Sequence, residues 1–274
     1  MAESRPDFRW RDLAGEIVAP PRLSWPGALL ALSLTAAYLS LSFFNDEHHF
    51  SIIIGLTALT GLAFFWHVES CLHLGLLLTL TAICLELPPL RDAWPLPPLI
   101  AIAGYLVLVD IWPRLRRSLE WPRLGRLGRR EWRWIALTVV VSSAALVIWF
   151  FTVRPDLADL KAKVPAWSPW WLAFAGVCFA GGNALAEEVI FRGLIQQALT
   201  AAFGRIGGLC LQAAAFGLLH IHGFPRGWSG VFLAAIYGLM LGAIRLVSRG
   251  LLAPWVAHVF ADLTIFGILV LLAG

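Results

Sequence analysis

Long apolar runs constrain this chain more than any other feature of its sequence. A helix that crosses a bilayer needs about 20 mostly apolar residues. The chain offers nine such candidates, at residues 25–44, 50–67, 71–88, 96–113, 134–152, 170–192, 206–221, 229–247 and 251–273. Most of the loops between them are short, so we expect neighbouring helices to be antiparallel. The sequence therefore predicts an all-α, polytopic membrane helix bundle of about nine transmembrane helices.

The composition supports a membrane protein rather than a soluble protein with a large core. Hydrophobic residues make up 59% of the chain and charged residues only 14%, whereas about a quarter of a soluble domain is charged. The net charge of +4 comes mostly from arginines in short loops. In a membrane protein this pattern indicates topology, and we expect no nucleic-acid partner.

One loop, residues 114–133, carries eight arginines and fixes the predicted topology. Because basic loops stay in the cytoplasm, we place this loop, the N-terminus, and the segments holding Arg205, Arg245 and Arg249 on the cytoplasmic side. The acidic segment 45–49 then lies outside. The loop also divides the chain into an N-terminal four-helix membrane block, residues 1–133, and a second membrane domain, residues 134–274.

Nearly all deeply placed ionisable residues lie in the second domain, on three separate apolar segments. Charged groups inside a membrane cost several kcal/mol unless they are paired or hydrated. We therefore expect these side chains to converge on one small wet cavity. They are Glu187, Glu188, Arg192, His220, His258 and Asp262.

Helical spacing suggests different tasks for these residues. Glu188 and Arg192 are four residues apart, so they share a helix face and can pair. Glu187 is rotated by about 100° from Glu188. We therefore expect Glu188 and Arg192 to form a structural clamp and Glu187 to be the reactive group.

Two further pairs have the same spacing of four residues. In the pair His258–Asp262, either the carboxylate orients the imidazole or both groups present polar hydrogens to one substrate oxygen. In the pair Phe216–His220, we expect the phenyl ring to shield one side of the imidazole.

The motifs EEVIFR at 187–192, FGLLH at 216–220 and HVFAD at 258–262 occur in this order on successive apolar segments. This order resembles the CPBP family of membrane proteases, also called the CAAX prenyl endopeptidase or Abi family. The resemblance covers roughly residues 134–274 and leaves the N-terminal block outside. It implies an intramembrane endopeptidase that hydrolyses a peptide bond in a membrane-anchored protein or peptide, without a cofactor.

The resemblance also implies roles for single residues. Glu187 is the general base that activates water, with help from His220. His258 and Asp262 stabilise the oxyanion, while Glu188 and Arg192 hold the site together. Many family members have asparagine where this chain has Asp262, and an ionised aspartate cannot donate a hydrogen bond. Asp262 is therefore either protonated or orients His258.

Two alternatives stay open at this stage. Glu187, His220 and His258 form an acceptable zinc ligand set, although they lack the spacing of a local zinc motif. Alternatively, the chain is a non-enzymatic immunity or scaffold protein that binds a peptide or a membrane protein. In each case the lipid bilayer is a partner. The arginine- and tryptophan-rich composition favours a bacterial inner membrane, with the N-terminus in the cytoplasm.

Overall fold

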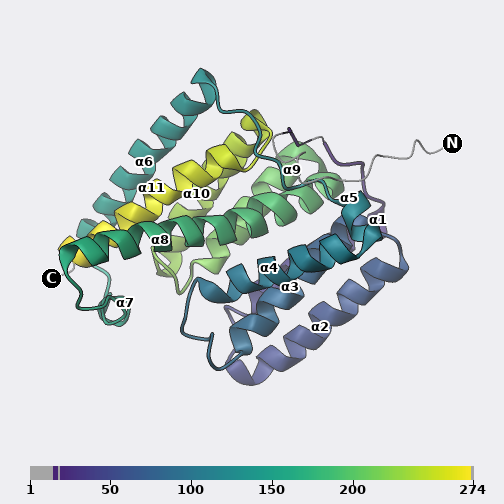
Figure 1. The fold of residues 1–274 in the computed structure, drawn as a ribbon, viewed down its shortest axis with the longest axis horizontal. Coiled ribbons are helices and arrows are strands. Elements are labelled where there is room, and N and C mark those ends of the chain that lie inside the picture. The colour runs from purple at the N-terminus through teal and green to yellow at the C-terminus, as the bar shows by residue number, and fades with distance from the viewer. Residues whose placement is uncertain (1–14, 18, 273–274) are drawn as a thin grey trace.

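The structure is a computed structural model that describes residues 15–17 and 19–272. Over these residues the regular elements are helices, and no strand is present (Figure 1). The first part of the chain forms α1 (Trp25–Ser40), α2 (Asp46–Phe65), α3 (Glu69–Glu86), α4 (Leu96–Ile111) and α5 (Pro113–Ser118). The predicted all-α fold class is confirmed.

The second part of the chain begins with the long helix α6, whose first residues belong to the arginine-rich segment. Its elements are α6 (Arg129–Val153), α7 (Ala158–Lys161), α8 (Pro169–Glu187), the π-helical segment η2 (Glu188–Ile195), α9 (Gln196–Leu219), α10 (Gly227–Ser248), α11 (Leu252–Gly267) and the π-helical segment η3 (Ile268–Leu272). Among the described residues, each of the nine predicted apolar runs overlaps one of these α-helices, and the runs 170–192 and 251–273 also extend into the π-helical segments η2 and η3.

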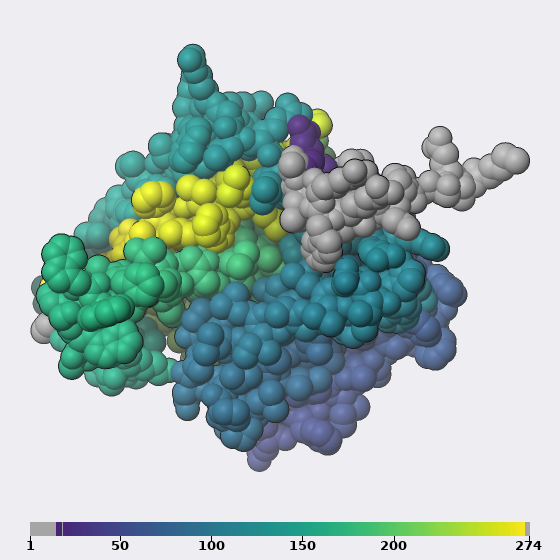
Figure 2. Space-filling view, viewed as in Figure 1, coloured from purple at the N-terminus to yellow at the C-terminus, as the bar shows by residue number. Residues whose placement is uncertain are grey.

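Helix α8 runs through the middle of the molecule and contacts helices of both halves. It packs against α4 on one side and against α11 on the other. Figure 1 shows α2, α3 and α4 on one side of α8, with α6, α10 and α11 on the other. In the space-filling view the two groups of helices lie against each other along α8 (Figure 2). Several residues in the last turns of α8, among them Asn183 and Glu187, are buried between the two halves of the chain.

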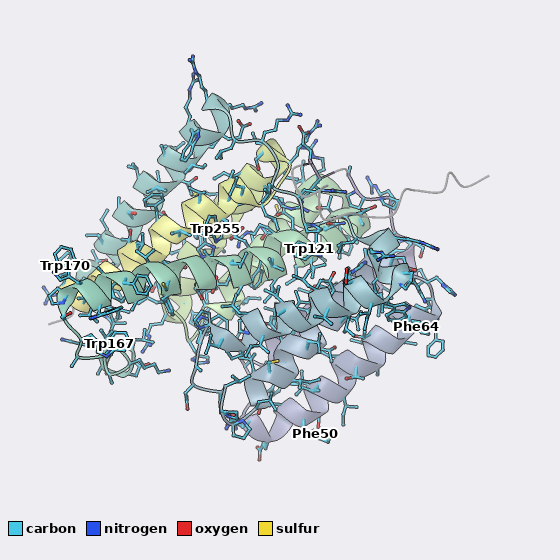
Figure 3. The ribbon with its side chains drawn as sticks, in the orientation of Figure 1. Phe50, Phe64, Trp121, Trp167, Trp170 and Trp255 are labelled. Carbon is cyan, nitrogen blue, oxygen red and sulfur yellow. The ribbon has the colours of Figure 1, made fainter. Side chains whose placement is uncertain are left out.

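Six of the described helical stretches are long and apolar enough to cross a membrane, and two shorter apolar helices, α1 and α4, accompany them. Many large apolar side chains face outward, especially on α2 and α6. Tryptophans collect near the start of α8, where Trp167 and Trp170 are exposed (Figure 3). Such exposed rings are typical of the membrane–water interface. The chain is an integral membrane protein.

A sharp turn at Gly204 separates two of the predicted spans, although the helix is otherwise continuous from Pro169 to Leu219. Gly204 has φ 77° and ψ 176°, a conformation that is essentially restricted to glycine. The chain folds back so closely that a Cβ on Gly208 would lie 2.5 Å from the backbone nitrogen of Thr200. The predicted spans 170–192 and 206–221 therefore belong to two helical arms of a tight hairpin.

The segments predicted to be cytoplasmic lie together at one end of the molecule. The backbone of 123–126 bonds to the turn between α10 and α11, with 2.7 Å from Arg126 N to Ser248 O. Ile17 bonds to the same turn, and Leu23 N donates to Ala201 O in the arm that precedes Gly204. Their common location agrees with the prediction, whereas the side of the membrane stays a prediction. Residues 1–14, which were also predicted to be cytoplasmic, lie outside the described residues.

Helix ends differ from the predicted ranges where capping groups extend them. Helix α2 begins at Asp46, inside the predicted acidic loop, with Asp46 and Glu47 in its first turn. Carboxylates favour a helix N-terminus because they face its partial positive charge. Helix α6 begins at Arg129, where Glu131 accepts a hydrogen bond from Gly128 N.

We predict that Gly204→Ala destabilises the protein by about 1–3 kcal/mol, because a Cβ is strained at this backbone conformation. Thermal unfolding of the purified protein in detergent measures the change. Gly55→Ala is the matched control, because a Cβ at Gly55 in α2 meets nothing within 4 Å. Equal unfolding temperatures for the two variants would contradict the hairpin.

Candidate active site

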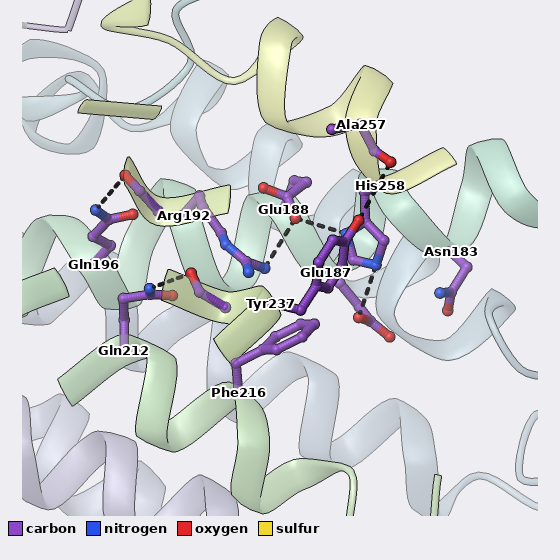
Figure 4. A network of polar contacts seen from close by, with 12 residues as sticks. Asn183, Glu187, Glu188, Arg192, Gln196, Gln212, Phe216, Tyr237, Ala257 and His258 are labelled. Carbon is purple, nitrogen blue, oxygen red and sulfur yellow. Dashed lines mark hydrogen bonds and ion pairs between the residues drawn. The ribbon is translucent and has the colours of Figure 1, made fainter. Parts of the chain in front are cut away.

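The predicted site residues come from α8, η2, α9 and α11, which meet in the interior. Glu187 ends α8 and Glu188 begins η2, while His258 lies on α11. Figure 4 shows these side chains turned toward one another rather than toward the surface. Six of the seven predicted residues are buried, namely Glu187, Glu188, Arg192, Phe216, His258 and Asp262, and His220 is half-buried.

Glu188 and Arg192 form the pair that their spacing predicts. Arg192 Nη1 donates to Glu188 Oε1 at 2.9 Å, and the arginine side chain is fully buried. The guanidinium also lies over the ring of Phe216, 4.3 Å from the ring centre. A buried cation needs such partners because desolvation of an isolated charge is costly. The pair therefore anchors η2 against α9.

The imidazole of His258 is surrounded by three carboxylates. Its Nδ1–H donates to Glu188 Oε1 at 2.7 Å. On the other side, Nε2 lies 3.5 Å from Glu187 Oε2 and 3.8 Å from Asp262 Oδ1. Glu188 is thus the carboxylate that orients the ring by a hydrogen bond, and Nε2 faces the space between Glu187 and Asp262.

His220 caps the end of α9 and is separated from His258 by Phe216. Its Nδ1–H donates to Phe216 O at 2.8 Å, and its ring centre lies 4.5 Å from that of Phe216. The phenyl ring also contacts His258, at 5.9 Å between ring centres. Because Nδ1 carries the proton in this bond, the neutral His220 ring keeps a lone pair on Nε2.

The chain changes from an α-helix to a π-helix at the two glutamates. We expected one α-helix over 170–192, but the π-helical turns begin at Glu188, and all eight residues of η2 are buried. Pi-helical turns are rare and often occur at functional sites. The wider turn still brings Arg192 back beside Glu188, so the predicted pairing survives the change in geometry.

Three residues near the site were missed by the sequence analysis. Asn183 is buried one turn before Glu187 and donates to Asp262. Tyr237 donates to Ala257 O and contacts the His258 ring edge-on. Arg245, which we placed in a cytoplasmic turn, is a buried residue in the last turn of α10. The amide of Asn183 inside an apolar run was a readable signal, whereas an aromatic residue such as Tyr237 gives none.

Several buried polar atoms at the site make no hydrogen bond to the described residues. They are Oε2 of Glu187, Oε2 of Glu188, and Nε and Nη2 of Arg192. Most buried polar groups in proteins have a partner, so the cluster is suited to a polar guest such as water or a peptide group. Within the described part of the chain, no group of three His, Cys, Asp or Glu residues is placed to hold a metal ion.

Comparison with known proteins agrees with the motifs. Residues 166–264 match the family model described as type II CAAX prenyl endopeptidase Rce1-like, and this segment contains all seven predicted site residues. Neither a curated protein nor a solved structure matches the chain. The segment 166–264 of this integral membrane protein is therefore similar to the Rce1-like type II CAAX prenyl endopeptidases, as the three motifs predicted.

Proposed function

We propose that the protein is an intramembrane endopeptidase that hydrolyses a peptide bond in a membrane-anchored protein or peptide, with water activated by Glu187. One observation carries the proposal. The buried carboxylate of Glu187 lies 3.5 Å from the imidazole of His258, whose other nitrogen is fixed by Glu188. This arrangement supports the roles of Glu187 as base, His258 as donor and Glu188 as anchor. We further propose a bacterial inner membrane, with a cytoplasmic N-terminus.

The hydrolysis begins with the base. Glu187 takes a proton from a water molecule, and the water oxygen attacks the carbonyl carbon of the scissile bond. His220, with its lone pair on Nε2, assists in positioning the water. The C–N bond then breaks, and the proton held by Glu187 passes to the leaving amine. Positioned general bases contribute about 10²–10⁴-fold to such reactions.

The oxyanion of the tetrahedral intermediate forms on the side of His258 Nε2. In its doubly protonated form, His258 donates Nδ1–H to Glu188 and Nε2–H toward the space between Glu187 and Asp262. Donors that are already oriented stabilise an oxyanion strongly in a site with little water. Arg192 contributes indirectly, because it fixes Glu188.

We predict that Glu187→Gln abolishes proteolysis by removing the base, with a loss of about 10²–10⁴-fold. Comparative proteomics of membrane fractions from cells that express wild type or the variant would identify the substrate. A synthetic quenched peptide that spans the cleaved bond then gives the rate. Glu86→Gln is the matched control, because Glu86 bonds to His49 at the far end of α3. Wild-type cleavage by Glu187→Gln would refute the mechanism.

Removing one member of the clamp should affect folding rather than only the rate. We expect Arg192→Met to destabilise the protein by about 3–5 kcal/mol, because the buried carboxylate of Glu188 loses the arginine that balances its charge. The double variant Glu188→Gln/Arg192→Met should regain part of this loss. Thermal unfolding in detergent measures both. A double variant that is less stable than Arg192→Met would show that the pair is not the anchor.

The zinc alternative makes the opposite prediction about metal removal. We expect cleavage of the quenched peptide to persist in excess chelator, because the proposed steps use only side chains of the chain. Elemental analysis of the purified protein is expected to find zinc well below one atom per chain. Loss of activity in chelator that added zinc restores would instead favour a metal site built on Glu187, His220 and His258.

A further inference from the structure

Asn183 is the one buried amide of the described chain that bonds directly to a predicted catalytic residue. It lies on α8, one turn before Glu187, and its Nδ2 donates to Asp262 Oδ2 at 3.0 Å. Its Oδ1 accepts a hydrogen bond from the indole Nε1–H of Trp94, at 2.5 Å. Both ends of the amide are therefore used.

The indole partner determines which way the amide faces. Trp94 Nε1–H can only donate, so the atom of Asn183 that it meets must be the carbonyl oxygen. The NH₂ group is then directed to Asp262, and the usual ambiguity between the two ends of an asparagine is resolved. A carboxylate at position 183 would still accept from Trp94, but it would offer no hydrogen to Asp262.

Asp262 needs such a partner because it faces other carboxylates. Its Oδ1 lies 3.8 Å from His258 Nε2, and that nitrogen is also 3.5 Å from Glu187 Oε2. Because both carboxylates lie beside the same nitrogen, their like charges repel each other. The hydrogen bond from Asn183 fixes Oδ2, and this leaves Oδ1 on the side of His258. The plane of the carboxylate is thereby set relative to the general base.

Trp94 connects this arrangement to the other half of the chain. It lies in the loop between α3 and α4, outside the segment 166–264 that matches the family. The hydrogen bonds from Trp94 to Asn183 and from Asn183 to Asp262 cross from the α3–α4 loop to α8 and then to α11. Trp94, a residue of the N-terminal block, is therefore connected to Asp262 through two successive hydrogen bonds.

We propose that Asn183 is a positioning residue for the reaction, which holds the Asp262 carboxylate beside His258 and Glu187 and is itself oriented by Trp94. The inference rests on the proposed function, since it assigns the residue a part in the same hydrolysis. Asn183 acts through Asp262 and makes no contact with the reacting atoms. Its loss therefore lowers kcat and leaves KM nearly unchanged.

The test measures kcat and KM on the quenched peptide for five variants, of which one is a control. We predict that Asn183→Ala lowers kcat at least about tenfold, a loss equivalent to one good hydrogen bond. Asn183→Asp lowers it further, because two carboxylates then meet at the position of the present hydrogen bond. The exchange variant Asn183→Asp/Asp262→Asn restores the amide–carboxylate pair in reverse and is more active than Asn183→Asp alone.

Trp94→Phe keeps an aromatic ring and removes only the indole donor, and we predict a smaller loss of kcat in the same direction. Trp255→Phe is its control. Trp255 Nε1 also donates to α8, at Gly181 O, but this bond does not involve Asn183 or Asp262. Trp255→Phe is expected to keep the wild-type kcat. Thermal unfolding in detergent shows which variants are folded, so that a loss of rate is not mistaken for a loss of structure.

Two results would overturn the inference. One is a folded Asn183→Ala variant with kcat within about twofold of wild type, and the other is an exchange variant no more active than Asn183→Asp. Failure of the proposed function gives a different result. In that case folded wild-type protein cleaves no peptide, or Glu187→Gln cleaves as fast as wild type. Active wild type with inactive Glu187→Gln and fully active Asn183→Ala refutes the positioning role alone.

Discussion

The buried ion pair between Glu188 and Arg192 is the interaction on which the site depends. Burying either charge alone would cost several kcal/mol of desolvation free energy. Each partner of the pair compensates part of this cost for the other. Once the pair exists, Glu188 Oε1 has a fixed place and can accept the Nδ1–H of His258 as well. The free nitrogen of His258 is then aimed at Glu187. Glu187, the proposed base, thus meets an imidazole whose position is set by a different carboxylate, that of Glu188.

The N-terminal block contributes to the interior of the second domain. Its apolar side chains belong to one continuous core with residues of η2 and α9, including Leu34, Leu77, Phe191 and Phe216. Helix α1 packs on α9, and α3 contacts η2. The predicted division of the chain into two membrane domains at residue 133 therefore stays a prediction. In the structure, the two halves share one hydrophobic core. The proposed link from Trp94 extends this sharing to polar contacts.

Much of the fold and the identity of the site cluster could be predicted from the sequence, because membrane burial imposes long apolar runs and makes each charge within them conspicuous. The spacing of Glu188 and Arg192 gave their contact correctly. The sequence does not give the distances between side chains on different helices. It therefore could not show that Glu188 is the residue that orients His258 by a hydrogen bond. The sequence shows the departure at Asp262 and the single amide of Asn183 inside an apolar run, but it does not show that the two side chains bond to each other across helices.

The hairpin at Gly204 has a consequence for how the protein is made. Its two arms are joined without a hydrophilic connection, and Arg205 is the single charged residue near the bend. A bilayer-inserting machine that recognises segments one at a time meets 51 residues of nearly unbroken helix here. The two arms touch directly where Gly208 meets Thr200, so the arm that carries both glutamates is covered along this stretch by the arm that follows it.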